Sequence, residues 1–262
     1  MHHFEAGAAT LRGDAAHHLG RVLRAEPGQL YELSNGESVW LARTERVGRD
    51  SIEFTLVEPL PAQASRLRIR LLLSIVKFDR FEWALEKAAE LGADEIVPLC
   101  AERSENGLVS AAVKRAVRWE RILLEASQQA RRLRVPQLRA AAIAASAFTN
   151  APDGIRLLLS ERDGAAPMRE ALGTNAAPGD RTTVLPITLA IGPEGGWTDA
   201  EISAGAAAGF AAVSLGTAIL RTETAVCAAL AAVQYALGES RVTESNNASP
   251  AAARPEKRAA KR

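Results

Sequence analysis

Leu189-Ala190-Ile191-Gly192-Pro193-Glu194-Gly195-Gly196-Trp197 is an apolar segment that runs into a glycine-rich turn. A second segment of this kind covers residues 211–215 and is followed by Gly216 and by Ile219-Leu220-Arg221-Thr222-Glu223-Thr224-Ala225. Glycine has no Cβ, so a glycine at the end of a strand lets bare backbone approach a ligand. Two such loops so close in the sequence predict one shared pocket.

Strand-like and helix-like segments alternate on both sides of these loops. We expect strands at residues 67–75, 95–99, 155–159, 187–191 and 211–215, and helices at about 80–91, 110–132 and 223–237. This alternation predicts an α/β domain with a mostly parallel sheet that is covered on both faces. Ligands of such sheets bind beyond the carboxyl ends of the strands, where both glycine loops fall.

Several residues are placed to start these helices. Asp79 stands three residues before Glu82, a capping arrangement that predicts the first helix start. Thr198-Asp199-Ala200-Glu201 predicts another helix start directly after the first glycine loop. Thr222 suits an N-cap, and Glu223 suits the positive end of a helix dipole.

The first 62 residues predict a small β-rich domain. Asn35-Gly36 accepts the positive φ angles of a tight hairpin turn and lies between two apolar segments. Ile52 and Phe54 alternate with polar neighbours, as in a strand with one buried face. Several short strands within about sixty residues predict a small barrel. We also expect a helix at 15–24 and a proline-containing linker at 58–62.

The composition excludes several classes of protein. With 262 residues, 47% hydrophobic and 24% charged, the chain has the composition of a soluble globular protein of one or two domains. No apolar run approaches the roughly 18 residues that span a bilayer, and the first residues lack the pattern of a signal peptide. We therefore expect a cytoplasmic protein.

Cysteine and histidine are scarce, which narrows the chemistry. Cys100 and Cys227 lie in apolar sequence, so we expect small core residues rather than a disulfide framework or a cysteine metal site. The histidines occupy positions 2, 3, 17 and 18. The larger domain therefore has no histidine for a catalytic triad, a metal site or acid–base catalysis. We expect no metal.

Positive charge is concentrated in two places, although the net charge is only +1. Residues 114–134 carry an excess of five positive charges, with Arg131, Arg132 and Arg134 at the end. This stripe suits phosphate binding, and its simpler interpretation is a solvated helix face. Residues 241–262 carry an excess of four and few large apolar residues, which predicts a disordered basic tail or, alternatively, a weak RNA tether.

The first glycine loop matches no common phosphate-binding motif. It lacks the Lys and Ser or Thr of a P-loop and the spacing of a dinucleotide fingerprint, and alone it is explained by a tight turn. The second loop favours a binding site over a tight turn, because Arg221 precedes a helix start whose positive end repels a cation. A contact between Arg221 and an anion or carbonyl in a pocket is the better explanation. Lys87 and Glu90 are expected to form only a surface pair.

Further motifs stand in order around these loops. They are Ala16-His17-His18-Leu19-Gly20-Arg21-Val22-Leu23-Arg24 with Gly36, Glu86-Lys87-Ala88-Ala89-Glu90-Leu91-Gly92-Ala93 with Pro98, Glu102-Arg103-Ser104, and Arg132-Leu133-Arg134-Val135-Pro136. Together with the loops, they resemble the ribosomal RNA small subunit methyltransferase E family over nearly the whole chain except the tail. The N-terminus departs from the family by lacking an early arginine, and Gln128 stands where Glu is common.

The resemblance implies a fold, a cofactor and a substrate. It implies a PUA-like RNA-binding barrel at 1–62, followed by an α/β SPOUT-type trefoil-knot methyltransferase domain with a parallel sheet at 66–240. It implies S-adenosylmethionine as methyl donor, and N3 of a uridine in 16S rRNA of the small ribosomal subunit as acceptor. It also implies a homodimer, for which the alanine-rich final helix is suited. The cofactor would be held largely by backbone groups of Leu159, Gly192, Glu194, Gly195, Gly196, Leu215, Gly216, Ile219, Leu220 and Arg221.

Methylation of N3 requires the imide proton to leave and N3 to be aligned with the methyl group. We expect Arg221 to stabilise the negative charge that develops on the uracil oxygens, and Glu223, Glu194 or water to accept the proton. The base must be unpaired or extruded. The surrounding RNA is expected to contact His18, Arg21, Arg24, Arg131, Arg132 and Arg134. Two alternatives are a same-fold methyltransferase acting on tRNA or on a ribose 2′-OH, and a non-catalytic RNA-binding homologue.

Overall fold

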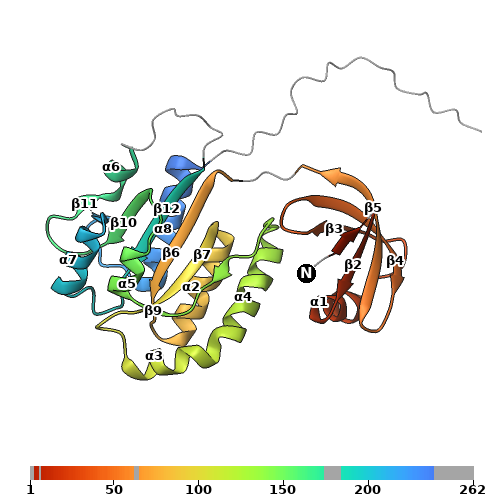
Figure 1. The fold of residues 1–262 in the computed structure, drawn as a ribbon, viewed down its shortest axis with the longest axis horizontal. Coiled ribbons are helices and arrows are strands. Elements are labelled where there is room, and N and C mark those ends of the chain that lie inside the picture. Colours follow the sequence, from red (N-terminus) through yellow and green to blue (C-terminus); the bar gives the residue numbers. More distant parts are fainter. Residues whose placement is uncertain (1–2, 6, 62–64, 174–183, 239–262) are drawn as a thin grey trace, which may run out of the picture.

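The computed structural model describes residues 3–5, 7–61, 65–173 and 184–238. These residues form two units, a small antiparallel sheet with a short helical segment and a larger α/β domain (Figure 1). The expected cofactor loops belong to the larger unit. The basic tail expected at 241–262 lies outside the described residues. So does all but Gly173 of the segment 173–180, whose Gly, Pro and Asn residues predict a variable surface loop.

The N-terminal unit, which we call the sheet domain, is a five-stranded sheet in the order β1-β2-β5-β4-β3. Its strands are β1 (His3–Glu5), β2 (Ala8–Arg12), β3 (Leu30–Ser34), β4 (Val39–Val47) and β5 (Ser51–Leu60). Ile52 and Phe54 are buried as the alternation predicts, and Leu11, Leu33 and Ala42 pack in the same core. Neighbouring strands pair antiparallel, with β1 and β3 at the two edges of the sheet.

Local details of the sheet domain differ from the expectation in two places. The hairpin at Asn35-Gly36 is confirmed, with a positive φ of 91° at Gly36. The expected helix at 15–24 is a short α1 (Asp14–His17) that continues as a π-helical turn, His18–Val22. The expected linker is wrong up to Leu60, because Pro59 pairs with Trp40 and extends β5. Proline is tolerated there because β2 flanks β5 only as far as Thr55.

The larger unit contains an eight-stranded sheet whose neighbouring strands, in the described residues, pair in parallel. The order is β11-β13-β10-β12-β6-β7-β8, with β9 also paired to β7. The strands are β6 (Leu67–Ser74), β7 (Ala93–Cys100), β8 (Gln137–Leu138), β9 (Ala142–Ile143), β10 (Ile155–Leu159), β11 (Ala166–Pro167), β12 (Leu185–Ile191) and β13 (Ala211–Ser214). The predicted α/β class and mostly parallel sheet are confirmed.

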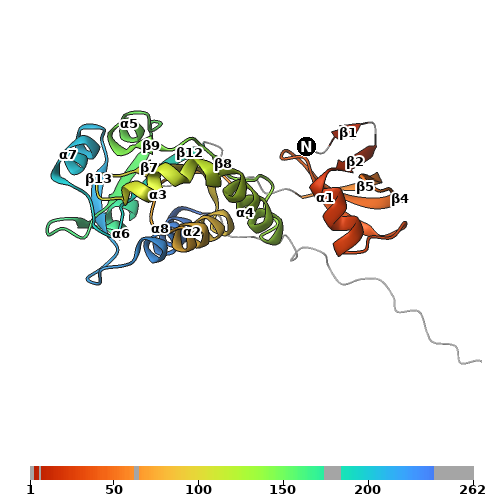
Figure 2. The same ribbon diagram turned by 90° about the horizontal axis from the view of Figure 1, so that it is seen from below.

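Helices cover both faces of this sheet (Figure 2). On one face lie α2 (Phe78–Glu90), α4 (Ala116–Gln129) and α8 (Thr222–Leu237), and on the other α5 (Ala144–Thr149) and α7 (Asp199–Ala207). The central strand β6 serves both cores, because Leu71 packs with the first group and Leu72 with the second. Its continuous apolar sequence therefore reflects burial on both faces.

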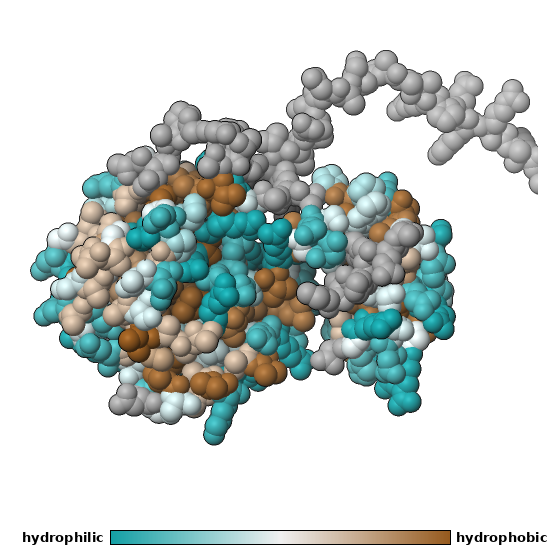
Figure 3. All heavy atoms as spheres, in the orientation of Figure 1, coloured by the Kyte–Doolittle hydropathy of each residue, from teal (hydrophilic) through white to brown (hydrophobic). Residues whose placement is uncertain are grey.

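The helix expected at 110–132 is wrong as a single element. It is divided into α3 (Asn106–Ala112), a 3-10 turn at Val113–Arg115, and α4. Val113 and Val117 at the division are 77% and 79% exposed, and apolar residues gather over this part of the surface in Figure 3. Part of the apolar pattern of the segment therefore faces outward.

The helix starts were predicted unevenly. Thr198 and Glu201 form the expected capping box at the start of α7. Asp79 does not cap α2, because the N-cap is Lys77 and makes no side-chain cap; Glu82 instead accepts hydrogen bonds from Arg115 and Arg118. α8 begins and ends within one residue of the expected bounds. The short elements β8, β9, α5, β11 and α6 (Met168–Gly173) were not predicted.

Candidate active site

Four loops meet at one edge of the parallel sheet, because each follows the carboxyl end of a strand. They follow β7, β10, β12 and β13 and occupy residues 101–105, 160–165, 192–198 and 215–221. We call the last two the first and second glycine loops. The four loops are joined by hydrogen bonds described below. The two loops that were expected to share a pocket thus lie at the same edge of the sheet.

The first glycine loop folds back over its own tryptophan. Trp197 is buried, and its Nε1 donates a hydrogen bond to the Leu159 carbonyl oxygen at 2.9 Å. A Cβ on Gly192 would lie 3.0 Å from the Trp197 ring, and Gly196 has a positive φ of 69°. These two glycines are therefore required by local geometry, and the Leu159 carbonyl is occupied by the same tryptophan.

The second glycine loop is open and apolar. Gly216 has a φ of 140°, and a Cβ placed there would meet no heavy atom within 4 Å. Ile219 is 78% exposed and Leu220 36%, whereas Leu215 is partly buried against the core. Exposed aliphatic side chains beside free backbone offer a surface that suits a partly apolar ligand.

One hydrogen bond joins the first glycine loop to the start of α8, where the second loop ends. The Thr222 hydroxyl donates to the Gly192 carbonyl oxygen at 3.0 Å, and Thr222 is buried. The expected N-cap role of Thr222 is wrong, because Arg221 occupies the N-cap position and Thr222 is the first residue of α8. The threonine thus fixes the separation of the loops.

The loop after β7 supports the first glycine loop from outside. Arg103 Nη1 donates to the Gly195 carbonyl oxygen at 2.7 Å, and the Glu102 amide donates to the buried Glu201 carboxylate at 2.9 Å. Arg162, from the loop after β10, donates to the Trp197 carbonyl oxygen at 2.8 Å. Sequence reasoning missed these contacts, and the available signal was the position of Glu102-Arg103 directly after a buried strand.

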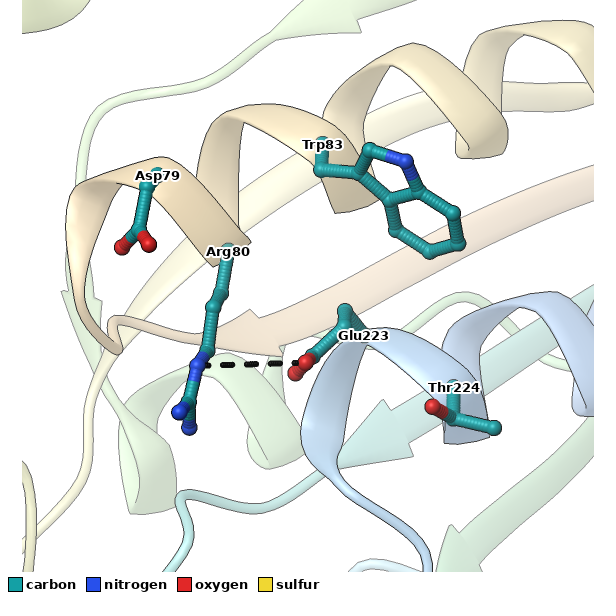
Figure 4. A pocket seen from close by; sticks show the side chains of 5 residues that line it. All are labelled: Asp79, Arg80, Trp83, Glu223 and Thr224. Carbon is teal, nitrogen blue, oxygen red and sulfur yellow. Dashed lines mark ion pairs between the residues drawn. The ribbon is translucent and has the colours of Figure 1, made fainter.

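Arg80 lies between the two glutamates that were expected as proton acceptors. Its guanidinium forms an ion pair with Glu194 of the first glycine loop, and its Nε lies 3.9 Å from Glu223 Oε1 in the first turn of α8. Arg80 and Glu223 line an open depression of about 370 Å³ together with Asp79, Trp83 and Thr224 (Figure 4). Arg80 was not predicted, and the signal was a cation in the first turn of a helix.

The two glutamates differ in their surroundings. The Glu223 side chain is 13% exposed, and its Oε2 is buried without a hydrogen-bond partner in the described part of the chain. The Glu194 side chain is 44% exposed. Arg221 is exposed, and its guanidinium has no ion pair or hydrogen bond to any described residue. Arg221 is thus free to meet a ligand, and Glu223 retains an unused acceptor.

The arginines expected to contact RNA fall into two groups. His18, Arg21 and Arg24 are exposed on the π-helical turn and just after it. Arg132 is only 15% exposed and donates to the carbonyl oxygens of Ala89, at 3.0 Å, and of Ala93. Its guanidinium is therefore committed within the α/β domain.

Arg131 and Arg134 lie against the sheet domain. Arg134 Nε donates to the Gly36 carbonyl oxygen at 2.6 Å, and Arg131 lies 3.8 Å from Glu32. The Ser34 hydroxyl donates to the Leu133 carbonyl oxygen at 3.0 Å. The hairpin between β3 and β4 and residues 131–134 thus form a contact between the two units.

Other expected features can be placed briefly. Lys87 forms ion pairs with Glu90 and Glu86, both at 2.8 Å. Cys100 and Cys227 are free and half-buried, and burial raises the pKa of both thiols. Among the described residues, no group of three or more His, Cys, Asp or Glu is arranged to hold a metal ion. The described helices include none long and apolar enough to cross a membrane.

Comparison with known proteins gives consistent matches. Residues 63–234 match the family model of an RNA methyltransferase domain. The ribosomal RNA small subunit methyltransferase E of a Synechocystis strain is 34% identical over 87% of this chain and 73% of its own. The Bacillus subtilis protein of the same name is 27% identical over 88% of this chain and 91% of its own.

Solved structures agree with these sequence matches. The ribosomal RNA small subunit methyltransferase E of Neisseria gonorrhoeae, solved with S-adenosylmethionine, is 31% identical with a TM-score of 0.75, over 89% of this chain and 94% of its own. A putative methyltransferase of Legionella pneumophila, solved with the same cofactor, is 32% identical with a TM-score of 0.77 over the same shares. The chain therefore belongs to the ribosomal RNA small subunit methyltransferase E family.

Proposed function

We propose that this chain transfers the methyl group of S-adenosylmethionine to N3 of a uridine in 16S rRNA of the small ribosomal subunit. The observation that carries the proposal is the pair of glycine loops, joined by the bond between Thr222 and Gly192, with a free Arg221 at its edge. Family membership supports the reaction class, and two relatives were solved with this cofactor.

The residues of the two loops fit the cofactor. The open backbone at Gly216 and the exposed side chains of Ile219 and Leu220 suit its adenosine and thioether parts, and Glu223 offers an unused carboxylate oxygen. We assign the backbone of Gly192, Glu194, Gly195 and Gly196, together with Leu159 and 215–221, to this site. When bound, the cofactor supplies an electrophilic methyl group.

The protein's own residues must prepare N3 for attack. We assign to Arg221 the stabilisation of negative charge on the uracil oxygens, because its guanidinium is exposed and has no partner among the described residues. We assign Glu223 rather than Glu194 as proton acceptor, because Glu223 is the more enclosed and keeps a free oxygen.

The RNA surface is assigned chiefly to the sheet domain. His18, Arg21 and Arg24 are exposed, and the two arginines carry positive charge on this surface. We leave Arg132 out of this surface because its guanidinium is bound within the α/β domain. Charge on an exposed turn can neutralise phosphates and release counterions. Double replacement of Arg21 and Arg24 by Gln should therefore weaken RNA binding and flatten its salt dependence.

Three further features belong to the proposal. The sheet order supports a trefoil knot. β10 lies between β12 and β13, so after β13 the chain must pass back over the end of β10 to start α8 beside Gly192 at the end of β12. A homodimer through α8 is supported by Tyr235, which is 95% exposed, and sedimentation tests it. We also propose that the sheet domain closes as a PUA-like barrel and that the protein acts in the cytoplasm.

The deciding experiment is methyl transfer from labelled S-adenosylmethionine to small ribosomal subunits that lack the modification, followed by reverse transcription. An N3 methyl group blocks base pairing and stops the polymerase at one uridine. A read-through product with incorporated label would place the methyl group on a ribose, and labelling of tRNA alone would identify another substrate. No incorporation with bound cofactor would indicate a non-catalytic RNA-binding protein.

A further inference from the structure

Arg80 stands at an electrostatically unfavourable place in α2. It lies in the first turn, where the helix dipole and unpaired amide groups disfavour a cation. Its side chain is nevertheless only 27% exposed. Its partners are Glu194 and Glu223, which come from the two different glycine loops or their borders. An interaction outside α2 therefore accounts for this arginine.

We propose that Arg80 is a positioning residue that holds the two glycine loops in the arrangement that binds S-adenosylmethionine. This inference rests on the proposed function only for the identity of the ligand. The ion pairs that hold the loops are present in the chain without a ligand. Arg80 forms an ion pair with Glu194 of the first loop. Its ion pair with Glu223, at the start of α8 where the second loop ends, is drawn in Figure 4.

The loops need such support because their backbone is intrinsically flexible. Glycine loses more conformational freedom on ordering than any other residue, and the first loop contains Gly192, Gly195 and Gly196. A site that binds through backbone groups loses affinity if those groups must be ordered when the ligand arrives. The Thr222 hydroxyl holds the start of this loop at the Gly192 carbonyl, and Arg103 and Arg162 hold the Gly195 and Trp197 carbonyl groups, but none of these contacts holds the Glu194 side chain. Arg80 fixes Glu194, two residues after Gly192.

The support is rigid because α2 is anchored in the core. Phe81 and Leu85, one and five residues after Arg80, are fully buried. Phe81 also packs against Trp119, with ring centroids 4.6 Å apart. The position of the Arg80 backbone is therefore set by the core and not by the loops. A planar guanidinium can also meet two carboxylates from different directions, which a lysine ammonium does less well.

Amide hydrogen exchange of the free, full-length chain tests the holding without any ligand. Arg80→Gln should speed exchange at residues 194–197 by about tenfold, the factor that corresponds to loss of one charge-assisted contact. Arg80→Lys should lie between the two. Arg43→Gln, which breaks an exposed 3.1 Å ion pair with Glu45 in the sheet domain, is the matched control and should leave these amides unchanged. Equal exchange in Arg80→Gln and the unsubstituted chain would overturn the proposal.

Calorimetric titration with S-adenosylmethionine tests the consequence for binding. Arg80→Gln should raise the Kd by about tenfold and raise KM for the cofactor more than it lowers kcat, because the contact is made before chemistry. In a double-mutant cycle, Glu194→Gln should add little once Arg80 is replaced. If the unsubstituted chain does not bind the cofactor, the proposed function is rejected. If it binds and Arg80→Gln has the same Kd, the role of Arg80 is rejected. The role of Arg80 is also rejected if the effects of Arg80→Gln and Glu194→Gln on the Kd are additive.

Discussion

Arg132 lies at the C-terminal end of a helix, whereas Arg80 and Arg221 lie at the N-terminal ends of helices. Arg132 lies at the C-terminal end of α2, where it donates to the carbonyl oxygen of Ala89 in the last turn. Arg80 and Arg221 lie at the N-terminal ends of α2 and α8. A helix C-terminus offers unpaired carbonyl groups to a guanidinium, whereas an N-terminus offers only donors. The helix end explains Arg132, whereas Arg80 is paired with carboxylates from outside α2, and Arg221 is exposed with no partner among the described residues.

The burial and the charged partners of Arg132 also differ from those of Arg80 and Arg221. Burial lowers the pKa of Arg132, and the carboxylate of Asp94, 3.4 Å away, opposes this shift. Arg80 receives two carboxylates from the glycine loops, and Arg221 receives no partner in the described part of the chain. For this reason, we assign roles in the proposed function to the two arginines at helix N-termini and not to Arg132.

Arg132→Ala should have the largest effect on stability. It removes a largely buried cation together with its hydrogen bonds to two carbonyl groups and its ion pair with Asp94, so we expect a loss of about 3 kcal/mol in unfolding free energy. In a domain of this size the melting temperature would fall by roughly 10 °C in calorimetry. Arg131→Ala, whose side chain is 78% exposed, is the control and should leave melting unchanged. If the Arg132→Ala variant is stable but binds RNA more weakly, Arg132 belongs to the RNA surface and not to the core of the α/β domain.

Arg221→Ala should have the largest effect on catalysis and almost none on stability. Loss of one preorganised cation at the developing oxyanion should lower kcat by about 100-fold, or about 2.7 kcal/mol. The Kd for S-adenosylmethionine should change by less than about twofold, because the proposed cofactor contact of Arg221 is through its backbone. Single-turnover kinetics and calorimetry separate the two. Unaltered turnover would remove Arg221 from the mechanism.

The architecture of the α/β domain was predictable because its signals are local. Continuous apolar strands and amphipathic helices gave the parallel sheet, and the Thr198–Glu201 pattern gave the start of α7. Expectations also failed in both units: at Glu82 and Pro59 a tertiary contact overrode a local signal, and the expected long helix is interrupted. Glu82 is bound by Arg115 and Arg118 and does not pair with a cap, Pro59 is tolerated in a strand flanked on one side, and residues 113–115 interrupt a helix.

The candidate site was predictable only in part. The glycine loops could be found because strand ends in a parallel sheet share one edge. Arg80 and Arg103 could not, since each is more than ninety residues from its partner loop and contacts it only after folding. The burial of Arg132 could not be foreseen either, because in the sequence a buried guanidinium at a helix end looks the same as an exposed one.

Thr222→Val should weaken the contact between the glycine loops without changing any charge. The buried hydroxyl is replaced by a methyl group of similar size, and the Gly192 carbonyl loses its donor. We expect a loss of about 1–2 kcal/mol in urea unfolding and faster amide exchange at 192–197. Thr222→Ser keeps the hydroxyl and is the control. Unlike the effect of Arg80→Gln, this loss should not depend on salt, and a salt-dependent loss would contradict the assignment.

Arg134→Ala should have the smallest effect on stability, because its exposed side chain touches only the hairpin of the sheet domain. We expect a change below about 0.5 kcal/mol in unfolding free energy. The variant should still bind RNA more weakly, since the sheet domain would be held less firmly beside the α/β domain. If Arg134 acts only through its contact with the Gly36 carbonyl, the salt dependence of RNA binding should match that of the unchanged chain. If the slope of log binding constant against log salt concentration falls by about one, Arg134 contacts a phosphate of the RNA. Arg134 would then be a ligand-binding arginine, as proposed for Arg221, and not a structural one like Arg132.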